Sequence, residues 1–90
     1  MAWKVELSPS ARRDIDKLDR QHAKRILRFI SERLANLEDP RTIGEALVGQ
    51  RFGEFWRYRV GDYRLLCKIQ DEQLALVVIK VGHRREVYRP

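Results

Sequence analysis

The chain opens with alternating apolar and polar positions, and two amphipathic segments follow. Residues 3–7 alternate as a half-buried strand does. Ser8 can cap a helix that has Pro9 at its first position, where no amide hydrogen is needed, and Asp19 can cap a second helix. A helical hairpin that ends at residues 38–40 is therefore expected. The second helix should bury one face, which carries Ala23, Ile26, Leu27, Ile30, Leu34 and Leu37.

The second half of the chain has the pattern of β-strands. Residues 54–60 and 63–69 predict two strands joined by a two-residue turn, and residues 74–81 are apolar at nearly every position, as in a central strand. A connector with one helical turn around residues 43–48 is expected before them. The whole chain, 1–90, then forms one α+β domain. It is an antiparallel sheet of about four strands with the helical hairpin on one face, in the order β-α-α-β-β-β.

The two-residue turn determines which side chains share a face of the predicted sheet. Arg59 should lie directly opposite Arg64, with Arg57 and Lys68 on the same face. Like charges in directly opposite positions are destabilising, and an anion bound between them would remove that cost. The pattern therefore predicts a phosphate site. The other face should meet the helices through Trp56, Tyr58, Val60, Tyr63, Leu65, Cys67 and Ile69.

The last strand is placed by its single cation. If Lys80 points away from the helices, then Val77, Ile79 and Val81 point toward them. The same alternation puts Gly82, Arg84 and Tyr88 on the arginine face.

Charge strengthens the case for a polyanionic partner. The formal net charge is +6, and fourteen of the nineteen basic residues are arginine, whose planar fork grips a phosphate through two hydrogen bonds. The basic outer face of the helical hairpin, interspersed with Asp14, Asp16 and Glu32, is interpreted as a solvated face rather than an RNA track. One cysteine excludes an intramolecular disulfide, and one cysteine with two distant histidines cannot form a structural zinc site. With no long apolar run and no signal-peptide pattern, a soluble, cytoplasmic protein without membrane contact is expected.

The candidate chemistry is cleavage of RNA, which carries its own nucleophile in the 2′-hydroxyl group. The enzyme must remove that proton, stabilise the charge that develops on phosphorus and protonate the leaving oxygen. Arginine is too weak a base for the proton transfers, which leaves His83 and Tyr88. No metal or cofactor is required. The cations that would stabilise charge or bind substrate are Arg57, Arg59, Arg64, Lys68, Arg84 and Arg85.

Several segments together resemble the RelE family of toxins from bacterial and archaeal toxin–antitoxin pairs. They are residues 7–11, 46–49, 56–64 and 81–88, of which Tyr63-Arg64 followed by Gly82-His83-Arg84-Arg85-Glu86-Val87-Tyr88 is the most specific. The resemblance implies a metal-independent endoribonuclease that enters the ribosomal A site, cuts mRNA and stops translation.

The same resemblance suggests roles and partners. Arg64 and Arg84 match the family's active-site arginines, and Tyr88 matches its C-terminal tyrosine. Arg57 and Arg59 stand where members carry basic residues, and His83 stands where some carry lysine. A RelB-like antitoxin that wraps the toxin and covers or distorts the site is implied, in a toxin–antitoxin hetero-oligomer.

Two other interpretations remain open from the sequence. Related ParE toxins share the fold and act on DNA gyrase, although the presence of Arg64, Arg84 and Tyr88 argues against that activity. A non-catalytic RNA-binding module would need only the basic charge, and it would bind RNA in a salt-sensitive manner without cleaving it.

Overall fold

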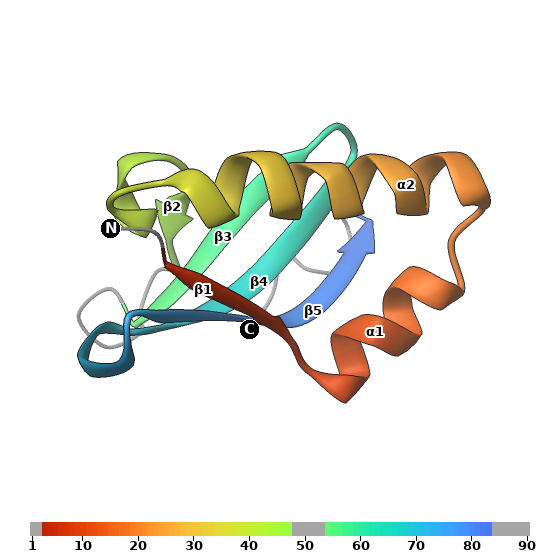
Figure 1. The fold of residues 1–90 in the computed structure, drawn as a ribbon. Helices are drawn as coiled ribbons and strands as arrows, with labels where there is room; N and C mark the ends of the chain where they lie inside the picture. Colours follow the sequence, from red (N-terminus) through yellow and green to blue (C-terminus); the bar gives the residue numbers. More distant parts are fainter. Residues whose placement is uncertain (1–2, 48–53, 84–90) are drawn as a thin grey trace.

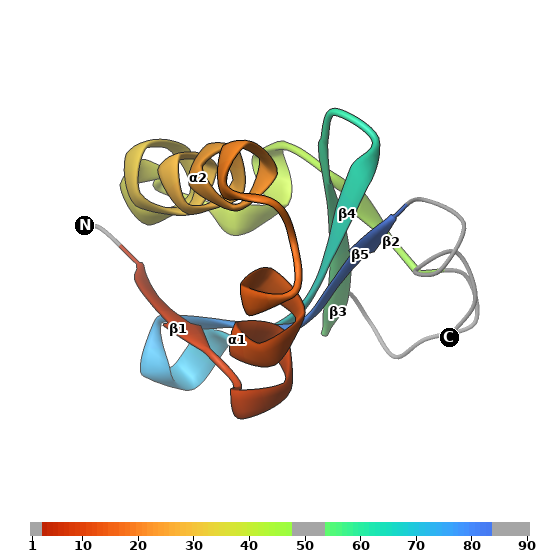
Figure 2. The same cartoon turned by 90° about the vertical axis from the view of Figure 1, so that its right-hand side faces the viewer.

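Two helices cover one face of a five-stranded sheet in the computed structural model, which describes residues 3–47 and 54–83 (Figure 1). Turning the molecule shows α1 and α2 on the same side of the sheet (Figure 2). The predicted α+β architecture, with a helical hairpin on one face, is confirmed. The strands lie in the order β1-β5-β4-β3-β2, with bounds β1 Lys4–Leu7, β2 Glu45–Ala46, β3 Phe55–Val60, β4 Tyr63–Gln70 and β5 Ala75–His83.

The sheet is mixed and not purely antiparallel, which corrects the prediction. β1 runs parallel to β5, with Lys4 beside Ala75, while the β3, β4 and β5 pairs are antiparallel. Alternation of apolar residues reveals which face of a strand is buried but carries no information on its direction or neighbour. Because two helices separate β1 from the later strands, the chain can return in either direction.

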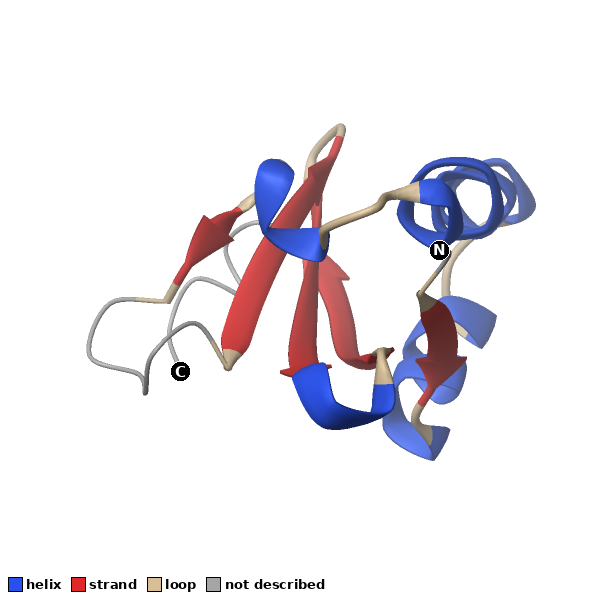
Figure 3. Cartoon of the chain, turned by 60° about the vertical axis from the view of Figure 1, so that its left-hand side comes forward, coloured by secondary structure: helices blue, strands red, loops and turns tan. Residues whose placement is uncertain are grey.

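A fifth strand, β2, lies where the sequence suggested a helical turn. Glu45 pairs with Arg57 and Ala46 with Trp56, so this short segment forms one edge of the sheet (Figure 3). The turn that does form is a 3-10 turn at Pro40–Thr42. The expected helical turn around residues 43–48 is therefore wrong within the described residues.

The helices begin at the predicted caps. α1 spans Pro9–Asp16, and the Ser8 hydroxyl accepts a hydrogen bond from the Ala11 amide at 3.0 Å. α2 spans Arg20–Arg28, and the Asp19 carboxylate accepts one from the His22 amide at 2.9 Å. α2 then continues as a π-helical turn, Phe29–Arg33, and a 3-10 turn, Leu34–Asn36. Among the residues described, no helix is long and apolar enough to cross a membrane.

The buried face of the second helical segment is narrower than the sequence suggested. Ile26, Ile30 and Leu34 enter the core, but Leu27 is 44% exposed. Residues four apart stack along one line of a helix, whereas Leu27 lies about 100° around the axis from Ile26. Burial of Leu27 was therefore a wrong prediction.

The sheet contributes the predicted inner face to the core. Tyr58, Leu65, Cys67 and Ile69 are each at most 3% exposed, and Trp56 and Tyr63 pack against the same cluster while half-buried. Burial raises the pKa of the Cys67 thiol and of the Tyr58 phenol. Cys67 is thus a core residue.

A β-bulge in β5 changes which of its residues face the helices. Lys80 pairs with Leu66 and Val78 with Cys67, so Ile79 has no partner on β4. The core therefore receives Leu76, Val78 and Val81. The placement of Val81 and the outward position of Lys80 are confirmed, whereas the inward placement of Val77 and Ile79 is wrong. A strict alternation cannot anticipate an inserted residue.

Candidate functional site

A surface cleft of about 370 Å³ opens where the connector before β2 crosses β3. Four parts of the chain meet there: the π-helical turn after α2, the connector at residues 43–45, β3 and β4. Distant parts of the sequence thus contribute to one hollow. Its lining residues are Phe29, Arg33, Ile43, Gly44, Glu45, Arg57, Tyr58, Arg59 and Arg64.

Three of the predicted phosphate-binding arginines line this cleft. Arg59 lies directly opposite Arg64 across the β3–β4 hairpin, and Arg57 lies opposite Leu66, which confirms the predicted register. Arg64 is only 9% exposed, and its Nη1 donates hydrogen bonds to the carbonyls of Gly61 at 3.1 Å and Tyr63 at 3.0 Å. Arg59 is exposed at the mouth. Of this opposed pair, Arg64 is therefore nearly buried and Arg59 reaches solvent.

The turn that brings Arg59 and Arg64 together depends on Gly61. Its φ of 61° lies in the left-handed region, which suits the first position of a type II′ turn. The backbone twist of this turn matches that of the flanking strands, so their residues stay in register up to the hairpin tip.

A carboxylate, Glu45, also lines the cleft. Its Oε1 accepts hydrogen bonds from Arg57 Nη2 at 2.6 Å and from Arg57 Nε at 3.2 Å. The pKa of Glu45 is lowered, first by these hydrogen bonds and the charge of Arg57, and further by the charges of Arg59 and Arg64. Glu45 therefore stays ionised near neutral pH. Glu45 binds Arg57 and does not bridge Arg59 and Arg64, so the predicted phosphate between that pair stays a prediction.

The backbone before Glu45 fits only glycine. Gly44 has a φ of 79°, and a Cβ atom there would lie 2.7 Å from the Arg57 carbonyl oxygen and 2.8 Å from Tyr58 Cδ1. Trp56 Nε1 donates a hydrogen bond to the carbonyl of Ile43 at 2.7 Å, which ties the connector to β3. These contacts hold Glu45 over Arg57.

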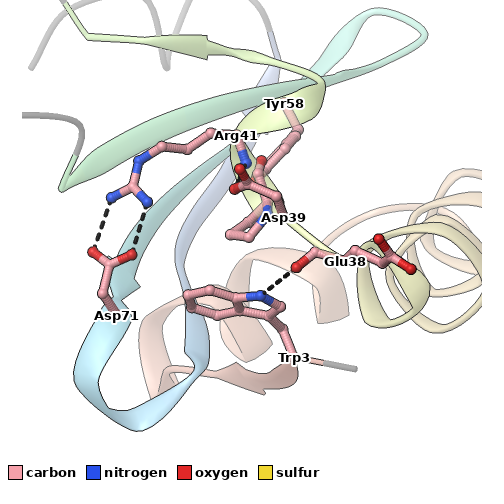
Figure 4. Close-up of polar contacts among 7 residues, drawn as sticks. Trp3, Glu38, Asp39, Arg41, Tyr58 and Asp71 are labelled. Carbon is pink, nitrogen blue, oxygen red and sulfur yellow. Dashed lines mark hydrogen bonds and ion pairs between the residues drawn. The ribbon is translucent and has the colours of Figure 1, made fainter. Parts of the chain in front are cut away.

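The rest of the connector is fastened at three further points (Figure 4). Trp3 Nε1 donates to the Glu38 carbonyl at 2.9 Å, and the buried Tyr58 hydroxyl donates to the Pro40 carbonyl. Arg41 binds both carboxylate oxygens of Asp71, at 2.8 Å and 3.0 Å. The Arg41 guanidinium lowers the pKa of Asp71 through these bonds. The segment that leads to Glu45 is thus held by core residues and by the β4–β5 loop.

His83 lies on the other side of the sheet from the arginines. It pairs with Tyr63, whose side chain faces the helices, and the two rings meet edge to face with centroids 5.9 Å apart. The Tyr63 ring also packs against the His22 ring, with the two centroids 5.1 Å apart. The structure therefore does not bring His83 into the arginine cleft. Its neighbour Gly82, in contrast, pairs with Arg64 on the arginine face, as the alternation predicted.

Of the remaining predicted site residues, the structure describes only Lys68. Lys68 lies further along β4, where its Nζ is 3.4 Å from the Glu54 carboxylate, and it does not line the cleft. Arg84, Arg85 and Tyr88 lie outside the described residues, so their predicted roles stay predictions. Across residues 3–47 and 54–83, no three His, Cys, Asp or Glu side chains gather so as to hold a metal ion.

Comparisons with known proteins show which family the chain belongs to. Residues 5–88 match the family described as "ParE toxin of type II toxin-antitoxin system, parDE". Over 89 residues, 99% of each chain, the sequence is 34% identical to "Toxin RelG" of Mycobacterium tuberculosis. The chain belongs to the RelE family of type II toxins. The predicted family resemblance is therefore confirmed.

Solved structures place this RelE-family toxin among toxin–antitoxin proteins. The M. tuberculosis toxin–antitoxin complex RelBE2 matches with a TM-score of 0.80 and 30% identity, over 93% of both chains. The Escherichia coli RelBE complex matches with a TM-score of 0.72 and 24% identity, over 91% of this chain and 96% of that one. The latter likeness shows a shared fold.

The sequence analysis missed several cleft residues of this toxin, among them Arg33, Gly44 and Glu45. Gly44 and Glu45 lay in a connector without a recognisable pattern, and Arg33 was counted with the solvated helical face. A glycine followed by an acidic residue is too common to indicate such a site. Arg33 reaches the cleft because the helix continues past Arg28 as a π-helical turn, which its apolar spacing does not reveal.

Proposed function

We propose that this toxin is a ribosome-dependent mRNA endoribonuclease that cleaves in the A site by attack of the 2′-hydroxyl group. The observation that carries the proposal is the convergence of Arg57, Arg59 and Arg64 in one cleft with the carboxylate of Glu45. Fixed cations suit a phosphodiester whose negative charge grows as the reaction proceeds. Membership of the RelE family supports the same reaction.

The arginines would stabilise the charge on phosphorus. Arg64 is held by backbone carbonyls and so needs little rearrangement, while Arg59 at the exposed mouth can bind the phosphate first. Removing one well-placed donor of this kind typically costs about 100- to 1,000-fold in rate. Arg84 is proposed to act with them, as the family motif indicates.

Glu45 is the proton acceptor that the described part of the cleft offers. Its pKa is low while Arg57 binds it. A substrate phosphate that takes over Arg57 removes this stabilisation, and its own negative charge disfavours a second anion nearby. The pKa of Glu45 then rises toward a range useful for a general base. Tyr88 is proposed as the proton donor, and His83, on the opposite face, is the less direct candidate for either transfer.

We also propose a RelB-like antitoxin as the partner. The structural neighbours from M. tuberculosis, E. coli and Pyrococcus horikoshii are RelE toxins solved with their antitoxins. A peptide laid over the cleft would keep mRNA from the arginines, and several such pairs would form a hetero-oligomer. Because ribosomes are the proposed target, a cytoplasmic location follows.

Primer extension on an mRNA in a translating extract tests the function. The wild-type toxin should give discrete cuts, and Arg59→Ala should reduce them by about 100-fold or more because it removes an exposed cation of the cleft. Arg12→Ala removes an exposed arginine of α1 and is the control for lost charge. It should cut like the wild-type protein.

Two results would replace the proposed ribonuclease function with another. If folded wild-type toxin leaves the mRNA intact but inhibits supercoiling by gyrase, the ParE-like activity replaces the proposal. If it binds ribosomes in a salt-sensitive way without cutting, the protein is an RNA-binding module.

A further inference from the structure

No strand in the described part of the chain accompanies the end of β5 on its β1 side. β1 accompanies β5 only from Ala75 to Val78, after which the chain turns away into α1. β4 continues along the opposite side as far as His83. The outer edge of residues 79–83 would therefore expose backbone groups that a sheet normally pairs.

Ser8, which caps the start of α1, and Asp14, near its end, bind this edge in place of a strand. The Ser8 amide donates to the Val78 carbonyl at 2.9 Å, and the Ser8 hydroxyl donates to the Ile79 carbonyl at 2.9 Å. The Val81 amide then donates to Oδ2 of Asp14 at 2.9 Å. Asp14 was expected on a solvated face, but it is half-buried against β5. That expectation is wrong because Asp14 lies beside the buried Ala11 and Ile15.

These contacts are made at the bulge itself. Ile79, whose carbonyl accepts from Ser8, is the residue without a partner on β4. A bulge bends its strand and increases the local twist, so the strand beyond it can take more than one course unless it is fastened. Ser8 also caps α1 through the Ala11 amide, and this couples the start of the helix to the bulge.

We propose that Asp14 is a positioning residue for the cleavage reaction, because it fixes the end of β5 relative to the arginine cleft. This inference rests on the proposed ribonuclease function. Gly82 lies opposite Arg64, one residue beyond the amide that Asp14 holds. The sequence continues directly from this strand end into Arg84 and Tyr88. The Asp14 bond therefore fixes the last described residues of β5 beside Arg64, and these residues directly precede Arg84 in the sequence.

The role requires an acceptor oxygen at this position. It does not require a negative charge. Asparagine has nearly the same shape and offers one oxygen acceptor, so Asp14→Asn should keep the bond to the Val81 amide. Asp14→Ala leaves that amide unpaired, and Asp14→Glu moves the carboxylate by one methylene. Ile15→Val trims the neighbouring core residue without touching the bond and is the matched control for stability.

The experiment measures single-turnover cleavage of mRNA on programmed ribosomes, with amide hydrogen exchange at Val81 in the same variants. Asp14→Ala, folded by circular dichroism, should cleave about 10-fold or more slowly, since a misplacement of about 1 Å can cost up to about 100-fold. Its Val81 amide should exchange faster. Asp14→Asn should restore both readouts, and Ile15→Val should lose thermal stability but cleave at the wild-type rate.

The outcomes separate this inference from the function on which it rests. If the wild-type toxin cleaves and folded Asp14→Ala cleaves at the same rate, only the inference about Asp14 is overturned. The same holds if Ile15→Val loses as much of the cleavage rate as Asp14→Ala does. If Asp14→Ala does not fold, Asp14→Glu decides: a slower rate with wild-type thermal stability supports positioning, and a wild-type rate overturns it. If wild-type toxin does not cleave at all, the proposed function fails and takes this inference with it.

Discussion

Glu45 has two opposed effects in the proposed reaction. It gives Arg57 a partner in the absence of RNA, and its pKa is lowered by that partner and by the charges of Arg59 and Arg64. The same carboxylate repels a phosphate that approaches the arginines. Glu45 should therefore weaken binding of RNA while it promotes cleavage.

Glu45→Gln separates these two effects. Without the negative charge, a 2′-deoxy mRNA that cannot be cut should bind more tightly to the ribosome-bound toxin. The rate of cleavage of ordinary mRNA should fall by about 100-fold or more, because a general base contributes about 100- to 10,000-fold. Binding and single-turnover rates measure the two separately. Tighter binding with an undiminished rate would show that Glu45 serves only as a counter-ion.

At the scale of elements, the connector before β2 helps to form the cleft together with the strands. It carries Glu45 across β3, and Gly44 allows the backbone to pass within van der Waals contact of Arg57 and Tyr58. β1, β3 and β4 were predictable because period-two alternation indicates a buried face, and β5 was predictable from its apolar run. The connector was not, because its course depends on single contacts such as the hydrogen bond from Trp56 to Ile43.

The two glycines of positive φ provide a matched test of the connector. In Gly44→Ala the new Cβ meets backbone at 2.7 Å, whereas in Gly61→Ala it meets the flexible end of Arg25 at 2.9 Å. Gly61→Ala should cost about 1–2 kcal/mol of unfolding free energy, from backbone strain alone. Gly44→Ala should cost clearly more. Urea unfolding measures both, and equal losses would show that the close contact at Gly44 relaxes easily.

In β5, only some of the residues were predicted on the correct face of the sheet. The face of Lys80 followed from its charge, and the position of Gly82 on the arginine face followed from parity. Because of the bulge at Ile79, however, the inward residues before it were predicted on the wrong face. A bulge depends on contacts from another element, here Ser8 and Asp14, and these are distant in the sequence.

At the scale of the whole molecule, the core and the arginine cleft use different parts of the sheet. The helices α1 and α2 lie on one side of the sheet (Figure 2), and the face toward them supplies the core, whereas Arg57, Arg59 and Arg64 line the cleft. The net charge of +6 favours approach to a polyanion, which in the proposed function is the ribosome with its mRNA, and the cleft is the proposed place of the reaction. The central claim is that this chemistry is attack by the 2′-hydroxyl group of mRNA.

An mRNA with one 2′-deoxynucleotide at the mapped cut position tests that claim most directly. On programmed ribosomes, the toxin should cut the all-ribose mRNA and leave a 2′,3′-cyclic or 3′-phosphate and a 5′-hydroxyl group. The deoxy-substituted mRNA should remain uncut at that position, because its nucleophile is missing. Cleavage that persists at the deoxynucleotide, or products with 5′-phosphate ends, would contradict the mechanism.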